Sequence, residues 1–299
     1  MNQSGTAPTP VIEVNNLVVE YGSRGHPTRA VNDVSFSVNA GECVGFIGPN
    51  GAGKSTTMKV LLGFMFPKSG SVKLFGNEPG AVAARQRLGY LPEVTLYYPF
   101  MKARELLFLY GGLQGMTRAQ LKERIPGLLA QVGLEGRGDS QLKNFSKGMQ
   151  QRVGIAQAII ADPELLILDE LSSGLDPVGR HDLRDVMLDL KARKRTIFFS
   201  SHELSEVETL CDRVIMINKG RVVMESPVAE LMKPLNIFEV EHELEGKRDT
   251  ITVNGAEKFN ATLTDILSRG GRIIATRTAT RSLEDYFIDI IRGHEGGRA

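Results

Sequence analysis

The sequence predicts an α/β fold organised around a mostly parallel sheet, and three observations support that prediction. Short apolar runs such as Leu165–Leu168 are typical of strands that are covered on both faces. Segments of helical periodicity lie between these runs, which implies right-handed β-α-β crossovers. A glycine-rich loop, Gly48–Thr56, stands between a strand pattern and a helix pattern. With 299 residues, the chain is long enough for one large core and a small second domain.

The first part of the chain predicts strands around one short helix. Residues 1–10 are polar and contain proline, and we expect them to form a flexible tail. A helical pattern at Ser55–Leu62 is closed by Gly63. Strand patterns occur at Val11–Glu20, Val34–Val38, Cys43–Ile47, Ser71–Phe75 and Arg87–Leu91.

The middle of the chain predicts an inserted helical lobe over about residues 94–163. Helical periodicity runs through Lys102–Val132 and Lys147–Ala161 without an intervening strand signal. Buried parallel strands are then expected at Leu165–Leu168, Thr196–Ser200 and Val214–Ile217. The main domain therefore covers residues 11–234.

Residues 235–299 predict a small α+β domain. The sequence leaves two roles for this domain: it either stabilises or dimerises the protein, or it is regulatory. The expected strands are Ile237–Glu241, Thr250–Val253 and Arg272–Thr276, and the expected helices are Thr262–Ser268 and, after a capping-like Ser282, Leu283–Ile291.

Bulk composition narrows the class of protein. With 41% hydrophobic and 24% charged residues, the chain has the composition of a soluble globular protein. A formal net charge of +1 gives no global electrostatic reason to expect nucleic acid as a partner. Cys43 and Cys211 are expected to be reduced core thiols, which favours the cytoplasm. No apolar run approaches the ~18 residues of a membrane span, so we expect the chain not to cross a bilayer alone.

The loop Gly48–Thr56 fits the phosphate-binding pattern GxxxxGK[ST] at every position. Its glycines allow backbone N–H groups to approach phosphates, and the following helix adds its positive dipole end. Lys54 is expected to reach the β and γ phosphates, and the Ser55 hydroxyl to ligate magnesium. The alternative is a chance glycine-rich turn, which the strand-loop-helix context disfavours. The predicted nucleotide contacts here are Asn50, Gly51, Ala52, Gly53, Lys54, Ser55 and Thr56.

Two acids follow the apolar run Leu165–Leu168 and match a Walker B strand. Asp169 is expected to hold magnesium, and Glu170 to polarise an attacking water. The alternative is a buried strand that ends in two surface acids.

The segment Phe145–Arg152 resembles the signature motif of ATP-binding cassette (ABC) ATPases. Ser146 is expected to cap a helix, and together with Gly148 it keeps two positions of the usual LSGGQ pattern. Lys147 and Met149 depart from that pattern, since the family commonly has Gly and Gln there. A hydroxyl, a glycine and a helix N-terminus still present donors to a γ-phosphate.

Further motifs resemble the same family in the family's order. Ser172–Asp176 resembles the D-loop, His202 the switch histidine, and Tyr21 the aromatic residue that stacks on adenine. Glu93 stands where the family generally has a Gln that touches magnesium and the lytic water. A carboxylate still suits a hard cation, so we expect retained ATP binding with an altered hydrolysis rate.

The resemblance covers roughly Val11–Glu230 and implies an ABC ATPase core with an antiparallel β subdomain and a helical lobe. It implies ATP and Mg²⁺ as ligands, and two cassettes stacked head to tail as a homodimer or a heterodimer. In each site, Lys54 of one copy would face Ser146, Gly148 and Asp176 of the other. The Lys147–Met149 variant and the Glu93 loop resemble the corresponding segments in the ATPase subunits of ABC-2-type exporters.

Such a subunit is cytoplasmic and lies on the inner face of the membrane through a separate transmembrane permease. Val94–Phe100 would receive that permease, although packing inside the lobe is the alternative. Two other functions compete with this one. A soluble ABC ATPase acting on nucleic acid or the ribosome is disfavoured by the single cassette and the lack of a basic stretch. A small-molecule kinase does not explain the Ser146 and His202 motifs.

Overall fold

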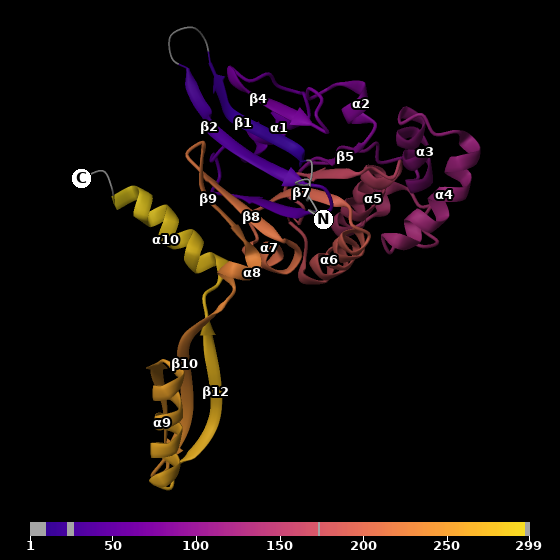
Figure 1. Ribbon diagram of the computed structural model, residues 1–299. Coiled ribbons are helices and arrows are strands. Elements are labelled where there is room, and N and C mark those ends of the chain that lie inside the picture. The colour runs from indigo at the N-terminus through magenta and orange to yellow at the C-terminus, as the bar shows by residue number, and fades with distance from the viewer. Residues whose placement is uncertain (1–9, 23–26, 173, 297–299) are drawn as a thin grey trace, which may run out of the picture. The chain divides into compact units, whose positions relative to one another are not determined.

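The computed structural model describes residues 10–22, 27–172 and 174–296 (Figure 1). The chain divides into two compact units, residues 1–226 and 227–299. The division falls before the predicted boundary after residue 234, because the short helix α8 (Val228–Leu231) belongs to the second unit. Of the predicted tail, residues 1–9 lie outside the described residues, and Pro10 begins the first strand.

A six-stranded sheet in the order β5-β6-β7-β3-β8-β9 forms the centre of the first unit. The pairs from β5 to β8 are parallel, as the apolar runs predict. Every residue of β3 and β6 is buried. The strands are β3 (Cys43–Ile47), β5 (Leu88–Leu91), β6 (Leu165–Leu168), β7 (Thr196–Ser201), β8 (Arg213–Asn218) and β9 (Arg221–Pro227).

An antiparallel sheet in the order β2-β1-β4 packs its apolar side chains into the same core. Phe36 of β2 contacts Phe46 and Phe198 of the central sheet, and the ring centroids are 5.6 Å apart in both pairs. This contact joins the two sheets around the strand that precedes the glycine-rich loop. The strands are β1 (Pro10–Tyr21), β2 (Thr28–Asn39) and β4 (Ser69–Leu74).

The helical lobe is present, but the predicted helix Lys102–Val132 is two helices. Gly115 has a φ of +83°, which ends the first helix, and Thr117 starts the second with a capping box to Gln120. Figure 1 shows α3, α4 and α5 grouped together beside β5. The helices of the first unit are α1 (Lys54–Leu61), α2 (Val82–Arg85), α3 (Ala103–Leu113), α4 (Arg118–Gln131), α5 (Lys147–Ile159), α6 (Pro177–Ala192) and α7 (Leu204–Leu210).

The second unit contains an antiparallel sheet in the order β11-β10-β12 with α9 on one face (Figure 1). Phe238 stacks on Phe259 of α9 with ring centroids 4.5 Å apart. Ser282 caps α10, since its hydroxyl accepts the Asp285 N–H at 3.2 Å. The elements are β10 (Pro234–Leu244), β11 (Lys247–Asn254), α9 (Ala256–Ser268), β12 (Arg272–Thr280) and α10 (Leu283–Gly296). Nowhere in the described part of the chain is a helix both long and apolar enough to cross a membrane.

Candidate active site

A cavity of about 540 Å³ opens at the carboxyl end of β3. It brings residues 49–56 of the predicted phosphate loop together with four residues from other parts of the sequence. Its wall consists of Ala30, Pro49, Asn50, Gly51, Ala52, Gly53, Lys54, Ser55, Thr56, Glu93, Glu170 and His202.

The loop backbone has the shape that a polyphosphate requires. Gly53 has a φ of +113°, and a Cβ there would lie 2.6 Å from the carbonyl oxygen of Ala30. Gly51 has a φ of +77° and no atom within 4 Å of the position of a Cβ, so its backbone is open to the cavity. Because α1 begins at Lys54, its unpaired N–H groups and positive dipole end meet this loop. The site therefore fits an anionic ligand that carries several phosphates.

Lys54 supplies a buried positive charge at the floor of the cavity. Its side chain is 6% exposed, and Nζ donates to the Gly48 carbonyl at 2.7 Å. The same nitrogen lies 3.6 Å from Oε1 of Glu170. The ammonium therefore stands between the phosphate loop and the acid that follows β6.

Both the side chain and the backbone N–H of Glu170 are fixed by contacts with neighbouring residues. Its second oxygen, Oε2, lies 2.5 Å from Nδ1 of His202. Its backbone has a φ of +49°, a left-handed conformation that is uncommon for a non-glycine residue and that occurs at functional sites. The Glu170 N–H donates to the Ser200 hydroxyl at 2.8 Å. These contacts place a carboxylate on the cavity wall, where it can orient or deprotonate a water molecule.

Asp169 lies behind the cavity rather than on its wall. Its Oδ1 accepts a hydrogen bond of 2.7 Å from the Ser200 hydroxyl. Burial raises the pKa of the Asp169 carboxyl, and the Ser200 hydrogen bond opposes that shift. Ser200 was not a predicted site residue. The register that pairs Leu168 with Phe199 places it beside Asp169, and the pairing of β6 with β7 was the signal that would have revealed it.

Tyr21 lies at the edge of the site, outside the set of residues that line the cavity. Its hydroxyl is hydrogen-bonded to the Thr56 hydroxyl at 3.1 Å. Tyr21 is 38% exposed. Its predicted role as a stacking surface stays a prediction.

Ser146, Gly148 and Asp176 do not line the cavity. Ser146 caps α5, with its hydroxyl accepting the Met149 N–H at 3.3 Å, and Asp176 caps α6 by accepting the Gly179 N–H at 2.8 Å. A Cβ on Gly148 would lie 3.6 Å from Gly179 Cα, so the two helices begin side by side. One chain therefore builds two separate groups of predicted site residues.

Gln151 of α5 was not predicted as a site residue. Gln151 of α5 is buried and donates to the Leu171 carbonyl at 2.7 Å, which links the α5 segment to the residue after Glu170. Its role depends on a tertiary contact, and no motif indicated it. Ser173 of the predicted D-loop lies outside the described residues.

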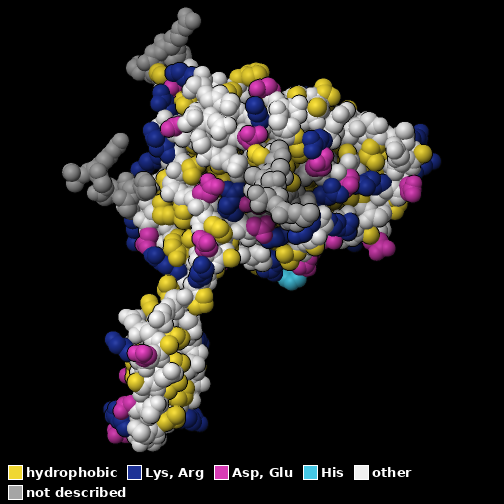
Figure 2. Space-filling view, viewed as in Figure 1, with side chains coloured by type: hydrophobic (Ala, Val, Ile, Leu, Met, Phe, Trp, Pro, Cys, Tyr) yellow, Lys and Arg dark blue, Asp and Glu magenta, His cyan; other side chains and the backbone are white. Residues whose placement is uncertain are grey.

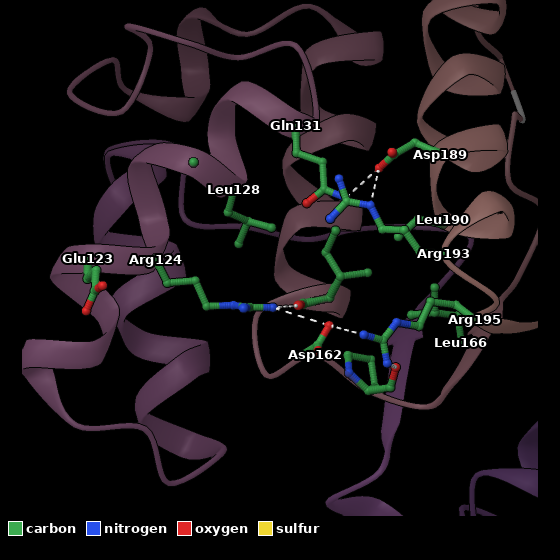
Figure 3. A pocket seen from close by; sticks show the side chains of 13 residues that line it. Glu123, Arg124, Leu128, Gln131, Asp162, Leu166, Asp189, Leu190, Arg193 and Arg195 are labelled. Carbon is green, nitrogen blue, oxygen red and sulfur yellow. Dashed lines mark hydrogen bonds and ion pairs between the residues drawn. The ribbon is translucent and has the colours of Figure 1, made fainter.

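A second cavity, of about 640 Å³, lies between α4 and α6 (Figure 3). Asp162 lies 2.7 Å from an Arg195 nitrogen and 3.7 Å from an Arg124 nitrogen. Asp189 accepts from Gln131 at 2.9 Å and pairs with Arg193 at 3.0 Å. Its charges are thus largely satisfied by one another, and none of the predicted site residues lines it.

Comparisons with known proteins identify relatives of this chain. The family model described as "ABC transporter" matches residues 31–173. An uncharacterized ABC transporter ATP-binding protein of Nostoc is 40% identical over 278 residues, which cover 86% of this chain and 82% of the relative. The Nod factor export ATP-binding protein I of Cupriavidus metallidurans is 38% identical over 251 residues, covering 82% of this chain and 81% of the relative.

A solved structure agrees as well. The ATP binding subunit of an ABC transporter superposes with a TM-score of 0.65 at 35% identity, covering 74% of this chain and 91% of that one. The chain therefore belongs to the ATP-binding proteins of ABC transporters and is an ATPase of that family.

Proposed function

We propose that this chain is the ATPase subunit of an ABC-2-type exporter and works as a head-to-tail homodimer on a separate membrane-spanning permease. The separation of the two groups of site residues supports the dimer. Lys54 and Glu170 share one cavity, whereas Ser146 and Gly148 lie outside it. In the proposed dimer the capped end of α5 closes over the nucleotide that the other copy holds, and each copy contributes to two sites.

Within one site, each residue has a separate role in ATP binding or hydrolysis. Lys54 and the loop N–H groups bind the phosphates, and Tyr21 stacks on adenine, a contact worth ~1 kcal/mol. Glu170 orients or deprotonates the attacking water, and His202 stabilises charge on the transferring phosphoryl. Asp176 and Ser146 act on the nucleotide held by the other copy.

Mg²⁺ suits the oxygen donors of Ser55 and Glu93, which line this cavity, and of Asp169, which lies behind its wall. The Ser55 hydroxyl and the Asp169 carboxylate would hold it, and Glu93 would add a carboxylate in place of the family's usual amide. When bound, Mg²⁺ would neutralise charge on the phosphates. We propose that Glu93 changes the hydrolysis rate and the magnesium dependence without abolishing ATP binding.

The observation that supports a permease partner is the apolar surface that follows Glu93. Leu96 is 91% exposed, and Tyr98 and Phe100 are also largely exposed. A neighbouring cavity of about 500 Å³ has more apolar than polar lining and includes Phe64 and Leu96. A surface of this kind suits a short helix from a membrane subunit. The Nod factor export relatives are named as export proteins, which supports the same direction of transport.

Membrane recruitment tests this proposal. The chain would be expressed together with a candidate membrane-spanning permease, and Leu96→Asp is expected to move the ATPase from the membrane fraction to the supernatant. The control is Leu267→Asp, an exposed leucine of the second unit, which should leave it with the membrane. Purified Leu96→Asp should hydrolyse ATP at the wild-type rate. A variant that stays membrane-bound would contradict this docking surface.

The alternative is an ABC ATPase that acts on nucleic acid. On the face drawn in Figure 2, Lys and Arg side chains are interspersed with Asp and Glu side chains. Together with the net charge of +1, this distribution does not favour binding to a phosphate backbone. Co-sedimentation of the ATPase with ribosomes or RNA, lost after nuclease treatment, would favour this alternative over the exporter.

A further inference from the structure

Two charged residues, Glu93 and Lys147, stand where the family pattern has uncharged ones. We infer that Glu93 of one protomer and Lys147 of the partner subunit are charge partners across each composite ATP site. The inference rests on the proposed head-to-tail dimer and adds to it a contact between two named residues.

Glu93 carries a negative charge that its own chain leaves unpaired. The side chain is exposed and lines the same cavity as Lys54 and Glu170. It makes no hydrogen bond or ion pair with any residue that the structure describes, whereas Glu170 contacts both Lys54 and His202. A second carboxylate beside bound phosphates adds repulsion unless a cation approaches from outside the chain.

Lys147 places a positive charge at the N-terminal end of a helix. It is the first residue of α5, it is exposed, and within the described part of the chain it forms no ion pair. The positive dipole end of a helix disfavours a cation there. The first turns of α5 and α6 contain no acidic residue, and the N-cap Asp176 already accepts the Gly179 N–H.

The position of the Lys147 side chain adds its charge to the group that contains Ser146. A Cβ built on Gly174 would overlap Nζ of Lys147, so the ammonium lies directly over that glycine. Gly174 also has a φ of +69°, which favours glycine independently. The ammonium therefore lies between the α5 cap and the D-loop, on the surface that the dimer turns toward the nucleotide of the other copy.

The dimer converts two unfavourable charges into one favourable pair. Each composite site gains one negative charge from Glu93 and one positive charge from Lys147 of the partner subunit. The two departures from the family pattern then leave the net charge around the phosphates unchanged. This complementarity accounts for both replacements with a single contact.

A double-mutant cycle tests the inference in a Glu170→Gln background, where slow hydrolysis is expected to let ATP-dependent dimers accumulate. The measured quantity is the ATP concentration that gives half-maximal dimer in analytical ultracentrifugation. Lys147→Met is expected to raise it about fivefold with Glu93 present and less than about twofold with Glu93→Gln. Lys143→Met, the same change at a nearby exposed lysine, should have no effect. An equal effect of Lys147→Met in both backgrounds would overturn the inference.

Mixing charge-reversed protomers tests whether the contact acts between copies. Dimers of Lys147→Glu or of Glu93→Lys alone place like charges in both sites, whereas a mixed dimer contains only opposite charges. We expect mixing to lower the required ATP concentration about threefold or more relative to either variant. A role of Lys147 within its own chain predicts no such rescue.

The outcomes separate the inference from the proposed function. If Glu170→Gln stays monomeric with ATP and magnesium, the head-to-tail dimer is wrong, and the inference fails with it. If it dimerises but shows neither the coupling nor the rescue, the charge pair alone is wrong.

Discussion

The two groups of site residues in this chain differ in how completely they are built. Around Lys54, charged side chains are buried and bonded to one another, and Glu170 is held through both carboxylate oxygens. Ser146 and Asp176, by contrast, are exposed, and the hydrogen bonds of their side chains cap α5 and α6. The difference indicates that one chain preorganises the Lys54 and Glu170 group, whereas in the proposed dimer the surface around Ser146 gains its partner from the other copy.

The largest expected effect comes from the preformed group. Glu170→Gln keeps the shape of the side chain but removes the basic oxygen, so ATP hydrolysis should fall by about 100- to 10,000-fold. ATP binding should persist, because Lys54 and the loop are unchanged. Phosphate release and equilibrium binding of labelled ATP measure the two properties.

Glu135→Gln is the matched control, since Glu135 is exposed on the helical lobe. It should leave both properties at the wild-type level. Near-normal turnover by Glu170→Gln would show that another group activates the water.

A smaller but more diagnostic effect is expected from the exposed group. Ser146→Arg places a bulky cation where the other copy's nucleotide should lie, and hydrolysis should fall by about 10- to 100-fold. ATP binding to the monomer should be unaffected, because Ser146 does not line the cavity.

Ser268→Arg, on the second unit, is the control for an added surface arginine. Circular dichroism would verify that the loss of the α5 cap leaves the helix content unchanged. Full activity of Ser146→Arg would mean that one chain hydrolyses ATP without the signature surface.

The same contrast describes what the sequence could reveal about the fold. β3 and β6 were predicted with their observed bounds, because a short apolar run between polar residues is typical of a parallel strand that is buried on both faces. β9 was missed, because it is only partly buried and has no strong pattern. The break between α3 and α4 was missed as well, since it depends on Gly115 and the Thr117 capping box rather than on periodicity.

For the site, motifs predicted residues that line the cavity but not the residues that position them. Lys54, Glu170 and His202 share one cavity, as expected. Ser200 and Gln151 escaped prediction, because each acts through a residue that is distant in sequence and near only after β6, β7 and α5 pack. The charge pair of Glu93 and Lys147 belongs to neither class, since it depends on a second copy.

The smallest predicted effect concerns the stability of the fold, which the partly buried carboxylate of Glu206 lowers at neutral pH. Glu206 of α7 accepts a hydrogen bond of 3.2 Å from Ser201, the residue before His202. Burial raises the pKa of the Glu206 carboxyl above its ordinary 4.5, and the hydrogen bond from Ser201 opposes the shift. Folding therefore favours the protonated form. This contribution to stability is complete below the unfolded pKa and is lost as the pH rises through the folded pKa.

Glu206→Gln keeps an oxygen that accepts from Ser201 and removes the buried charge. At pH 8 we expect it to raise the melting temperature by roughly 2 °C, and the gain should shrink as the pH falls toward 4.5. Glu135→Gln, whose carboxylate is exposed, should show no pH-dependent difference. Calorimetric scans across this range decide the matter: a gain that is constant with pH, or a loss at pH 8, would mean that the charge of Glu206 does not oppose folding.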